Sequence, residues 1–155
     1  MRTVSIDESG YTGADLLNAD QPFQGACAIA IPPDEAIRLI QTHFPKLKAA
    51  ELKYTALARR PSNRDRLLAL QTDVLGNFPV TTFVCDKRFL LLLYFLDYAA
   101  EPYYHRRGVN FYENGQNYSL ASLLYVAGPA LLGKSEFETV LIAFQEAVKR
   151  RRPRR

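Results

Sequence analysis

The stretch Val80-Thr81-Thr82-Phe83-Val84-Cys85-Asp86-Lys87 is the strongest indication of the fold. Its first six residues are β-branched, aromatic or small and apolar, which is typical of a strand, and Pro79 ends the helical pattern before it. The strand carries an acid and a cation, Asp86 and Lys87, at its carboxyl end. Open α/β sheets build their sites at this end of a strand, so Asp86 is predicted to occupy a functional position.

Two more strands are predicted nearer the N-terminus. Residues 2–7 alternate apolar and polar side chains, and residues 23–31 form a small, apolar run. A glycine-containing turn at residues 8–13 separates them. Helical spacing from Pro33 to Phe44, and again after a capping residue at Asn63, predicts two helices before the third strand.

From Arg88 onward the sequence is predominantly helical. The order of elements therefore predicts an α/β protein, with a mixed sheet flanked by helices and a mostly helical C-terminal half. We expect a single domain at residues 1–148, with a sheet-rich core at 1–88 and a helical part at 89–148. Residues 149–155 form a basic tail.

Size and composition narrow the class of protein. A chain of 155 residues with 48% hydrophobic residues fits one globular domain, so a disordered chain is not expected. The longest apolar run, Phe89–Leu96, is far shorter than the ~20 residues of a membrane span, and no signal-peptide pattern opens the sequence. We therefore expect a cytoplasmic protein with no membrane partner, whose Cys27 and Cys85 are reduced core thiols.

The net charge of +4 is unevenly distributed. Six of the 20 basic residues lie within residues 149–155, so the rest of the chain is close to neutral. Such a tail adds sequence-independent affinity for phosphate backbones, or it is a solvated helix end whose cations complement the helix dipole. The sequence leaves both interpretations open.

Three acidic segments are candidates for a metal site. Asp7 ends the first predicted strand and Glu8 follows it, Asp86 ends the third, and Glu51 stands two residues before Lys53. Carboxylate oxygens are the ligands that Mg²⁺ prefers, and two such ions can clamp the attacking and leaving oxygens of a phosphodiester. The alternative is that these acids are ordinary turn residues at strand ends.

The segments Val4–Gly10, Glu51–Lys53 and Thr82–Lys87 resemble successive blocks of a large, mostly bacterial family. It is catalogued as domain-of-unknown-function family 3800 and is marked by an N-terminal Asp-Glu-Ser-Gly. The resemblance covers about the first 90 residues. It implies a ribonuclease H-like fold, nucleolytic activity and the catalytic acids Asp7, Glu8, Glu51 and Asp86, with Lys53 and Lys87 beside the latter two.

The chain departs from this family at its C-terminal end. Family members carry a further Asp on a late helix, whereas the last predicted helix here offers Gln145 and Glu146. Either Glu146 replaces that carboxylate, or the fourth carboxylate is missing from an apparently shortened member.

Two segments are candidates for contacts with partners. The stretch after residue 101 interleaves aromatics with cations, so Tyr104, Arg106 and Arg107 could contact nucleic acid together with Arg150 and Arg151 of the tail. The alternative is that the tyrosines pack back onto the domain. The apolar run Phe89–Leu96 fits a homodimer or protein interface, although core burial is the expected outcome.

Together these features predict a nuclease that depends on Mg²⁺ or Mn²⁺. Asp7, Glu51 and Asp86 would ligate the metal, with Glu8 completing the acidic set, while Lys53 and Lys87 would hold a phosphate or offset the negative charge. The alternative is a non-catalytic module that binds nucleic acid or a protein. Hydrolysis of a small phosphorylated metabolite also stays open.

Overall fold

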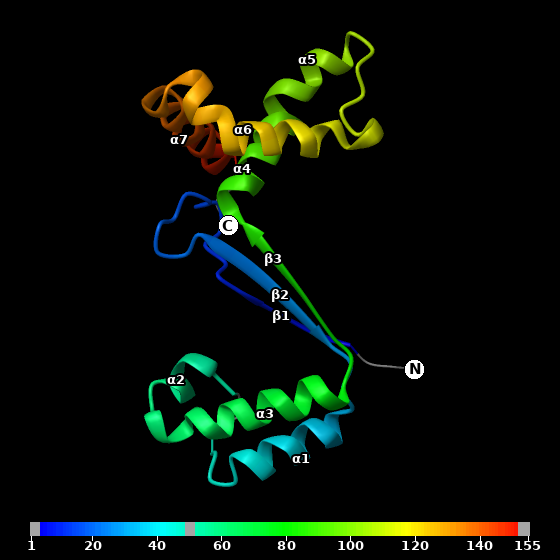
Figure 1. The fold of residues 1–155 in the computed structure, drawn as a ribbon, viewed down its shortest axis with the longest axis vertical. Helices are drawn as coiled ribbons and strands as arrows, with labels where there is room; N and C mark the ends of the chain where they lie inside the picture. Colours follow the sequence, from blue (N-terminus) through cyan, green and yellow to red (C-terminus); the bar gives the residue numbers. More distant parts are fainter. Residues whose placement is uncertain (1–3, 49–51, 152–155) are drawn as a thin grey trace. The chain divides into compact units, whose positions relative to one another are not determined.

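The computed structural model describes residues 4–48 and 52–151. It is a mixed α/β protein with a three-stranded antiparallel sheet in the order β1-β2-β3 (Figure 1). The strands are β1 (Ser5–Ser9), β2 (Phe23–Ile29) and β3 (Val80–Asp86). All three predicted strands are confirmed. The predicted mixed sheet would contain a parallel pair of strands, whereas the described strands pair only in the antiparallel direction.

The chain divides into two compact units, and the division falls within each of the three strands. The first unit takes Met1–Asp7 and Ala26–Phe83, and the second takes Glu8–Gly25 and Val84–Arg155. Backbone hydrogen bonds extend the pairing of β2 with β3 beyond the strands, from Ala30 N to Pro79 O at 3.0 Å and from Lys87 N to Pro22 O at 2.9 Å.

The first unit is helical outside the strands. It contains α1 (Pro33–His43), α2 (Tyr54–Ala58), a 3₁₀ turn (Pro61–Asn63) and α3 (Arg64–Asn77). Helix α3 packs against both α1 and α2 (Figure 1). Leu39 and Phe44 are buried, and His43 Nε2 lies 2.7 Å from Asp73 Oδ2 to link α1 with α3.

The sequence correctly places Asn63 at the start of α3, but the predicted capping hydrogen bond from its side chain is wrong. Asn63 precedes the helix as expected, but its side chain makes no capping hydrogen bond. Instead Nδ2 donates to Leu57 O at 3.1 Å, at the end of α2. The 3₁₀ turn between the two helices orients the side-chain amide of Asn63 towards α2, so this residue links α2 to α3.

The second unit holds the larger core. Its helical segments are α4 (Lys87–Phe95), a π-helical turn (Leu96–Ala100), α5 (Glu101–His105), a 3₁₀ turn (Glu113–Gly115), α6 (Gln116–Leu132) and α7 (Lys134–Arg151). Helix α4 packs against α6 and α7 (Figure 1). The buried cluster consists of Leu16, Leu91, Leu92, Phe137 and Leu141. Core burial is thus confirmed for the middle of the run Phe89–Leu96.

A glycine allows α6 and α7 to approach closely. A Cβ atom added at Gly128 would lie 2.6 Å from Cε2 of Phe137, which is itself buried. The following Pro129 lies inside α6, so the helix continues through both residues. The close contact between these helices therefore depends on the missing side chain at Gly128.

Several boundaries and exposures differ from the predictions. Helix α7 continues to Arg151, so the first three residues of the predicted tail are helical, while residues 152–155 lie outside the described residues. Both cysteines are free, but Cys27 is exposed on β2 and Cys85 is half-buried, so the prediction of two core thiols is wrong for Cys27. The apolar run around Cys27 gave no indication of which of its side chains are covered. In the part of the chain that the structure describes, no helix has the length and apolar character of a membrane span.

Candidate functional site

Asp86 is held at the junction of β3 and α4. It is the N-cap of α4, and its Oδ1 accepts a hydrogen bond from Phe89 N at 3.0 Å. Its Oδ2 accepts one from the Tyr125 hydroxyl at 2.9 Å, and this bond raises the pKa of Tyr125. An ionised carboxylate has about four acceptor positions, so two bonds fix its orientation without using all of them.

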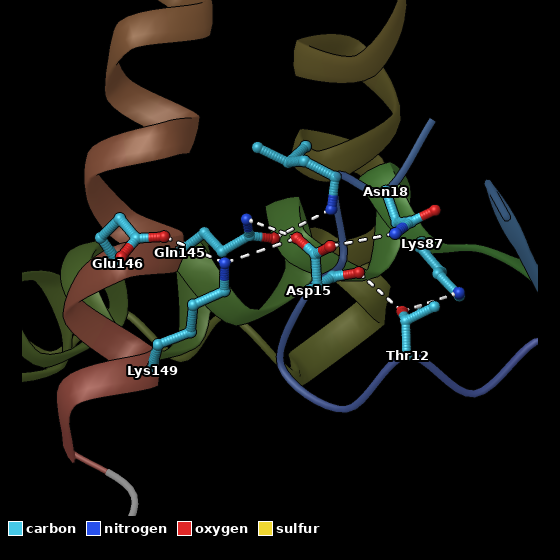
Figure 2. A network of polar contacts seen from close by, with 8 residues as sticks. Thr12, Asp15, Asn18, Lys87, Gln145, Glu146 and Lys149 are labelled. Atoms are coloured by element: carbon cyan, nitrogen blue, oxygen red, sulfur yellow. Dashed lines mark hydrogen bonds and ion pairs between the residues drawn. The ribbon is translucent and has the colours of Figure 1, made fainter. Parts of the chain in front are cut away.

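Lys87 follows Asp86 and is fully buried, with 0% of its surface exposed. Its Nζ donates to Thr12 Oγ1 at 2.9 Å, and Thr12 Oγ1 donates to Asp15 O at 2.6 Å (Figure 2). Within the described residues, no carboxylate forms an ion pair with Lys87. The side chain therefore supports the junction from inside, and it has no surface with which to touch a phosphate arriving from solvent.

Asp15 joins the loop after β1 to α7. Its Oδ1 accepts from Gln145 Nε2 at 3.1 Å and lies 3.4 Å from Lys149 Nζ, and its Oδ2 accepts from Asn18 Nδ2 at 3.1 Å (Figure 2). The hydrogen bond that Asn18 donates is the largest cause that lowers the pKa of Asp15. The positive charge of Lys149 and the hydrogen bonds from Lys149 and Gln145 lower this pKa further. The carboxylate is therefore stabilised in its ionised form.

Gln145 and Lys149 complete this network on α7. Buried Gln145 accepts a hydrogen bond from Leu17 N at 2.9 Å, so its amide bonds the loop at two points. Lys149 Nζ also lies 3.0 Å from Glu146 Oε1, which places the carboxylate considered as a fourth acid in an ion pair within α7.

Sequence reasoning missed this network. Its hydrogen bonds between the loop and α7 join residues 128 to 134 positions apart, and hydrophobic periodicity carries no information about such pairings. A local signal did exist, because Thr12 and Asp15 have the spacing of a hydroxyl-stabilised turn. The structure confirms that turn, with Asp15 N donating to Thr12 O at 3.2 Å.

The lowered pKa of Asp15 predicts an acid-dependent loss of stability. The unfolded chain binds the proton more tightly than the folded chain, so this contribution is complete above the unfolded value of 3.8 and is lost as pH falls through the lower folded value. We expect Asp15→Asn to flatten the fall in unfolding free energy between pH 5 and pH 2, measured by urea denaturation. An unchanged slope in this variant would contradict the assignment.

The other predicted acids lie elsewhere in the chain, and those that the structure describes do not share the environment of Asp86. Asp7 and Glu8 are consecutive exposed residues within β1, which runs on to Ser9, so their side chains point to opposite faces of the sheet. Glu51 lies outside the described residues, and Lys53 is exposed just before α2. In residues 4–48 and 52–151, no three His, Cys, Asp or Glu side chains form a group able to hold a metal ion.

The predicted nucleic-acid contacts sit around α5 and at the end of α7. Tyr104 packs against Phe111 with ring centroids 5.2 Å apart, and Arg106 Nε donates to Pro102 O at 3.0 Å. The Arg107 guanidinium lies 3.6 Å from the Tyr103 ring centroid. All of these side chains except Phe111 keep exposed surface. Both sequence interpretations thus remain compatible with these contacts.

The C-terminal contact residues are less fully described. Arg150 is exposed near the end of α7, and the side chain of Arg151 lies outside the part that the structure describes. The resemblance to a known family remains a prediction from the short segments that suggested it. Comparisons of the chain with protein-family models, with curated proteins and with solved structures found no match.

Proposed function

We propose that the chain is a ribonuclease H-like phosphodiesterase that hydrolyses nucleic acid with the help of Mg²⁺ or Mn²⁺. The observation that carries this proposal is the setting of Asp86 at the carboxyl end of β3. Two hydrogen bonds orient its half-buried carboxylate, from Phe89 N and the Tyr125 hydroxyl, and acceptor positions remain. Proteins commonly orient metal-binding carboxylates through such partners.

The donor chemistry of Asp86 fits one ligand of a hard divalent cation, which prefers carboxylate oxygens, water and phosphate oxygens. Glu51 and one of the two acids Asp7 and Glu8, which lie on opposite faces of the sheet, join it in the proposal on the strength of their sequence pattern. When bound, the ion supplies Lewis-acid activation of a water molecule and of the phosphodiester. The water adds at phosphorus as one ester P–O bond breaks, leaving a phosphate monoester and a hydroxyl.

Lys87 has an indirect role in this proposal. Its buried ammonium follows Asp86 directly in the sequence and carries a positive charge into the interior of the second unit. A cation reduces the mutual repulsion of carboxylates that are brought together around a metal ion. Lys87 thereby positions the site and balances its negative charge, and it does not touch the bound substrate.

The test is Asp86→Asn, because asparagine can still cap α4 while the charge is lost. We expect cleavage of nucleic acid to fall at least ~100-fold, and Mn²⁺ binding measured by calorimetry to disappear. The matched control is Asp97→Asn, since Asp97 Oδ1 accepts the Tyr112 hydroxyl at 3.1 Å, much as Asp86 accepts that of Tyr125. Full cleavage by Asp86→Asn in saturating metal would refute the proposal.

One observation favours a second candidate, a non-catalytic binding module. Both carboxylate oxygens of Asp86 already accept hydrogen bonds from the chain itself, which is enough to explain the residue as a structural cap. Such a module would bind nucleic acid equally well in EDTA and in Mg²⁺, and its affinity would fall with salt. Equal binding in both media, with no cleavage by the wild-type chain, would establish this candidate over the first.

A further inference from the structure

The first unit contains an open groove that the proposed hydrolysis does not use. It lies between α2 and the N-terminal half of α3 and has a volume of about 420 Å³. That volume falls within the range of sites for small ligands, roughly 300 to 1,000 Å³. The lining residues are Tyr54, Ala58, Pro61, Arg64, Leu67, Leu68 and Gln71.

Helical spacing explains why these residues line one groove. Arg64, Leu68 and Gln71 stand at positions i, i+4 and i+7 of α3, so they share one face of that helix. Tyr54 and Ala58 are four residues apart on α2. Asp73 stands nine residues after Arg64, about half a turn round the helix from it, and pairs with His43 of α1.

One cation, Arg64, lines the groove, and it belongs to a basic stretch of the chain. Residues 59–66 contain four arginines and one acid, Asp65. The four arginines are Arg59, Arg60, Arg64 and Arg66, and all of them are exposed. In the described part of the chain none of the four forms an ion pair. The charge of Arg64 is therefore available to an anionic ligand in the groove.

The lining also offers a flat aromatic surface. Tyr54 is 62% exposed, and Leu68, on the face of α3 that lines the groove, is exposed to the same extent. An aromatic ring beside apolar side chains suits a nucleobase, while the guanidinium group of Arg64 suits a phosphate that flanks it. A groove of this size accommodates a base that has left its stack, whereas a duplex keeps its bases paired.

We propose that this groove binds a base and its adjacent phosphates in single-stranded nucleic acid. Arg64, which lines the groove and forms no ion pair in the described part of the chain, favours this occupant over an uncharged peptide segment, which would not balance its charge. The proposal stands independently of the hydrolytic function, because contacts to arginine and tyrosine require no metal ion. It also differs from the predicted contacts at Tyr104, Arg106 and Arg107, which belong to the second unit.

The experiment measures binding of a fluorescein-labelled oligouridylate and oligothymidylate to the full chain by fluorescence anisotropy in EDTA. We expect Tyr54→Ala to weaken binding about 5- to 150-fold, the range for loss of one stacked base, and Tyr54→Phe to bind like the wild type. The matched control is Tyr118→Ala, because Tyr118 is 60% exposed in the second unit.

A second variant tests the phosphate contact. Arg64→Gln should reduce the steepness of the plot of log Kd against log salt by about 0.7, the value for one phosphate contact on a single strand. Lys46→Gln removes an exposed cation of the same unit that does not line the groove, and it should leave the slope unchanged. Circular dichroism melting curves establish that each variant folds like the wild type.

The outcomes separate this proposal from the proposed hydrolysis. Weaker binding by Tyr54→Ala and Arg64→Gln, with normal binding by Asp86→Asn, supports the groove whether or not the chain cleaves nucleic acid. Wild-type affinity in both groove variants overturns it, as does an equal loss in Tyr118→Ala. Absence of oligonucleotide binding by the wild type also overturns it, and would direct attention to a protein ligand.

Discussion

Replacing Gly10 by alanine is expected to lower the free energy of unfolding by about 3 kcal/mol or more. Gly10 has a φ of +79°, where an L-residue is strained by ~1–2 kcal/mol. A Cβ atom there would also lie 2.3 Å from the backbone oxygen of Phe23. Backbone cannot rotate away as a side chain can, so the loop and β2 would have to separate.

Gly13→Ala is the matched control for this variant. Gly13 lies in the same loop with a φ of +65°, but a Cβ atom there would have no neighbour within 4 Å. It should therefore lose only the conformational part, about 1 kcal/mol. Urea denaturation followed by circular dichroism measures both. Equal losses in the two variants would mean that the contact with Phe23 relaxes at little cost.

Replacing Lys87 by methionine should raise the stability of the fold and slow the cleavage of nucleic acid. In the described chain, the buried ammonium donates a hydrogen bond to one hydroxyl, that of Thr12. Taking a charge out of water costs several kcal/mol. Methionine fills a similar volume without that cost, and Thr12 keeps its own donated bond to Asp15 O. We expect the unfolding free energy to rise by about 1–3 kcal/mol.

The same variant tests the proposed function. If the charge of Lys87 balances the acids of a metal site, Lys87→Met should cleave nucleic acid at least ~10-fold more slowly despite its greater stability. Lys46→Met, at an exposed lysine, should change neither quantity. A less stable Lys87→Met would show that the ammonium makes net favourable interactions, and unchanged cleavage would remove it from the site.

The local parts of the fold were predictable. The β-branched run at 80–85 forms β3, proline and acids at residues 33–35 begin α1, and the leucines at 91, 92 and 96 are buried. In each case, short-range sequence preferences and burial act in the same direction. The extension of β1 to Ser9 was not predicted, because pairing with β2 outweighs the weak strand preference of Glu8 and Ser9.

The environment of the candidate site was less predictable. The sequence identified Asp86 and Lys87 but indicated neither the hydroxyl of Tyr125 nor the buried contact with Thr12. Those contacts depend on the packing of α4 against α6 and on the course of the loop after β1. The groove beside α3 was also missed, because it depends on how α2 packs against α3, which helical periodicity does not indicate.

The link between Asp15 and Gln145 has a consequence for protein synthesis. The second unit is assembled from residues 8–25 and from the chain after residue 83, with the whole of Ala26–Phe83 made in between. Its loop therefore leaves the ribosome long before α7 exists to receive it. Leu16 and Leu17 remain without their partners throughout this interval, so the apolar surface of the nascent N-terminal segment stays exposed until the later helices have been made.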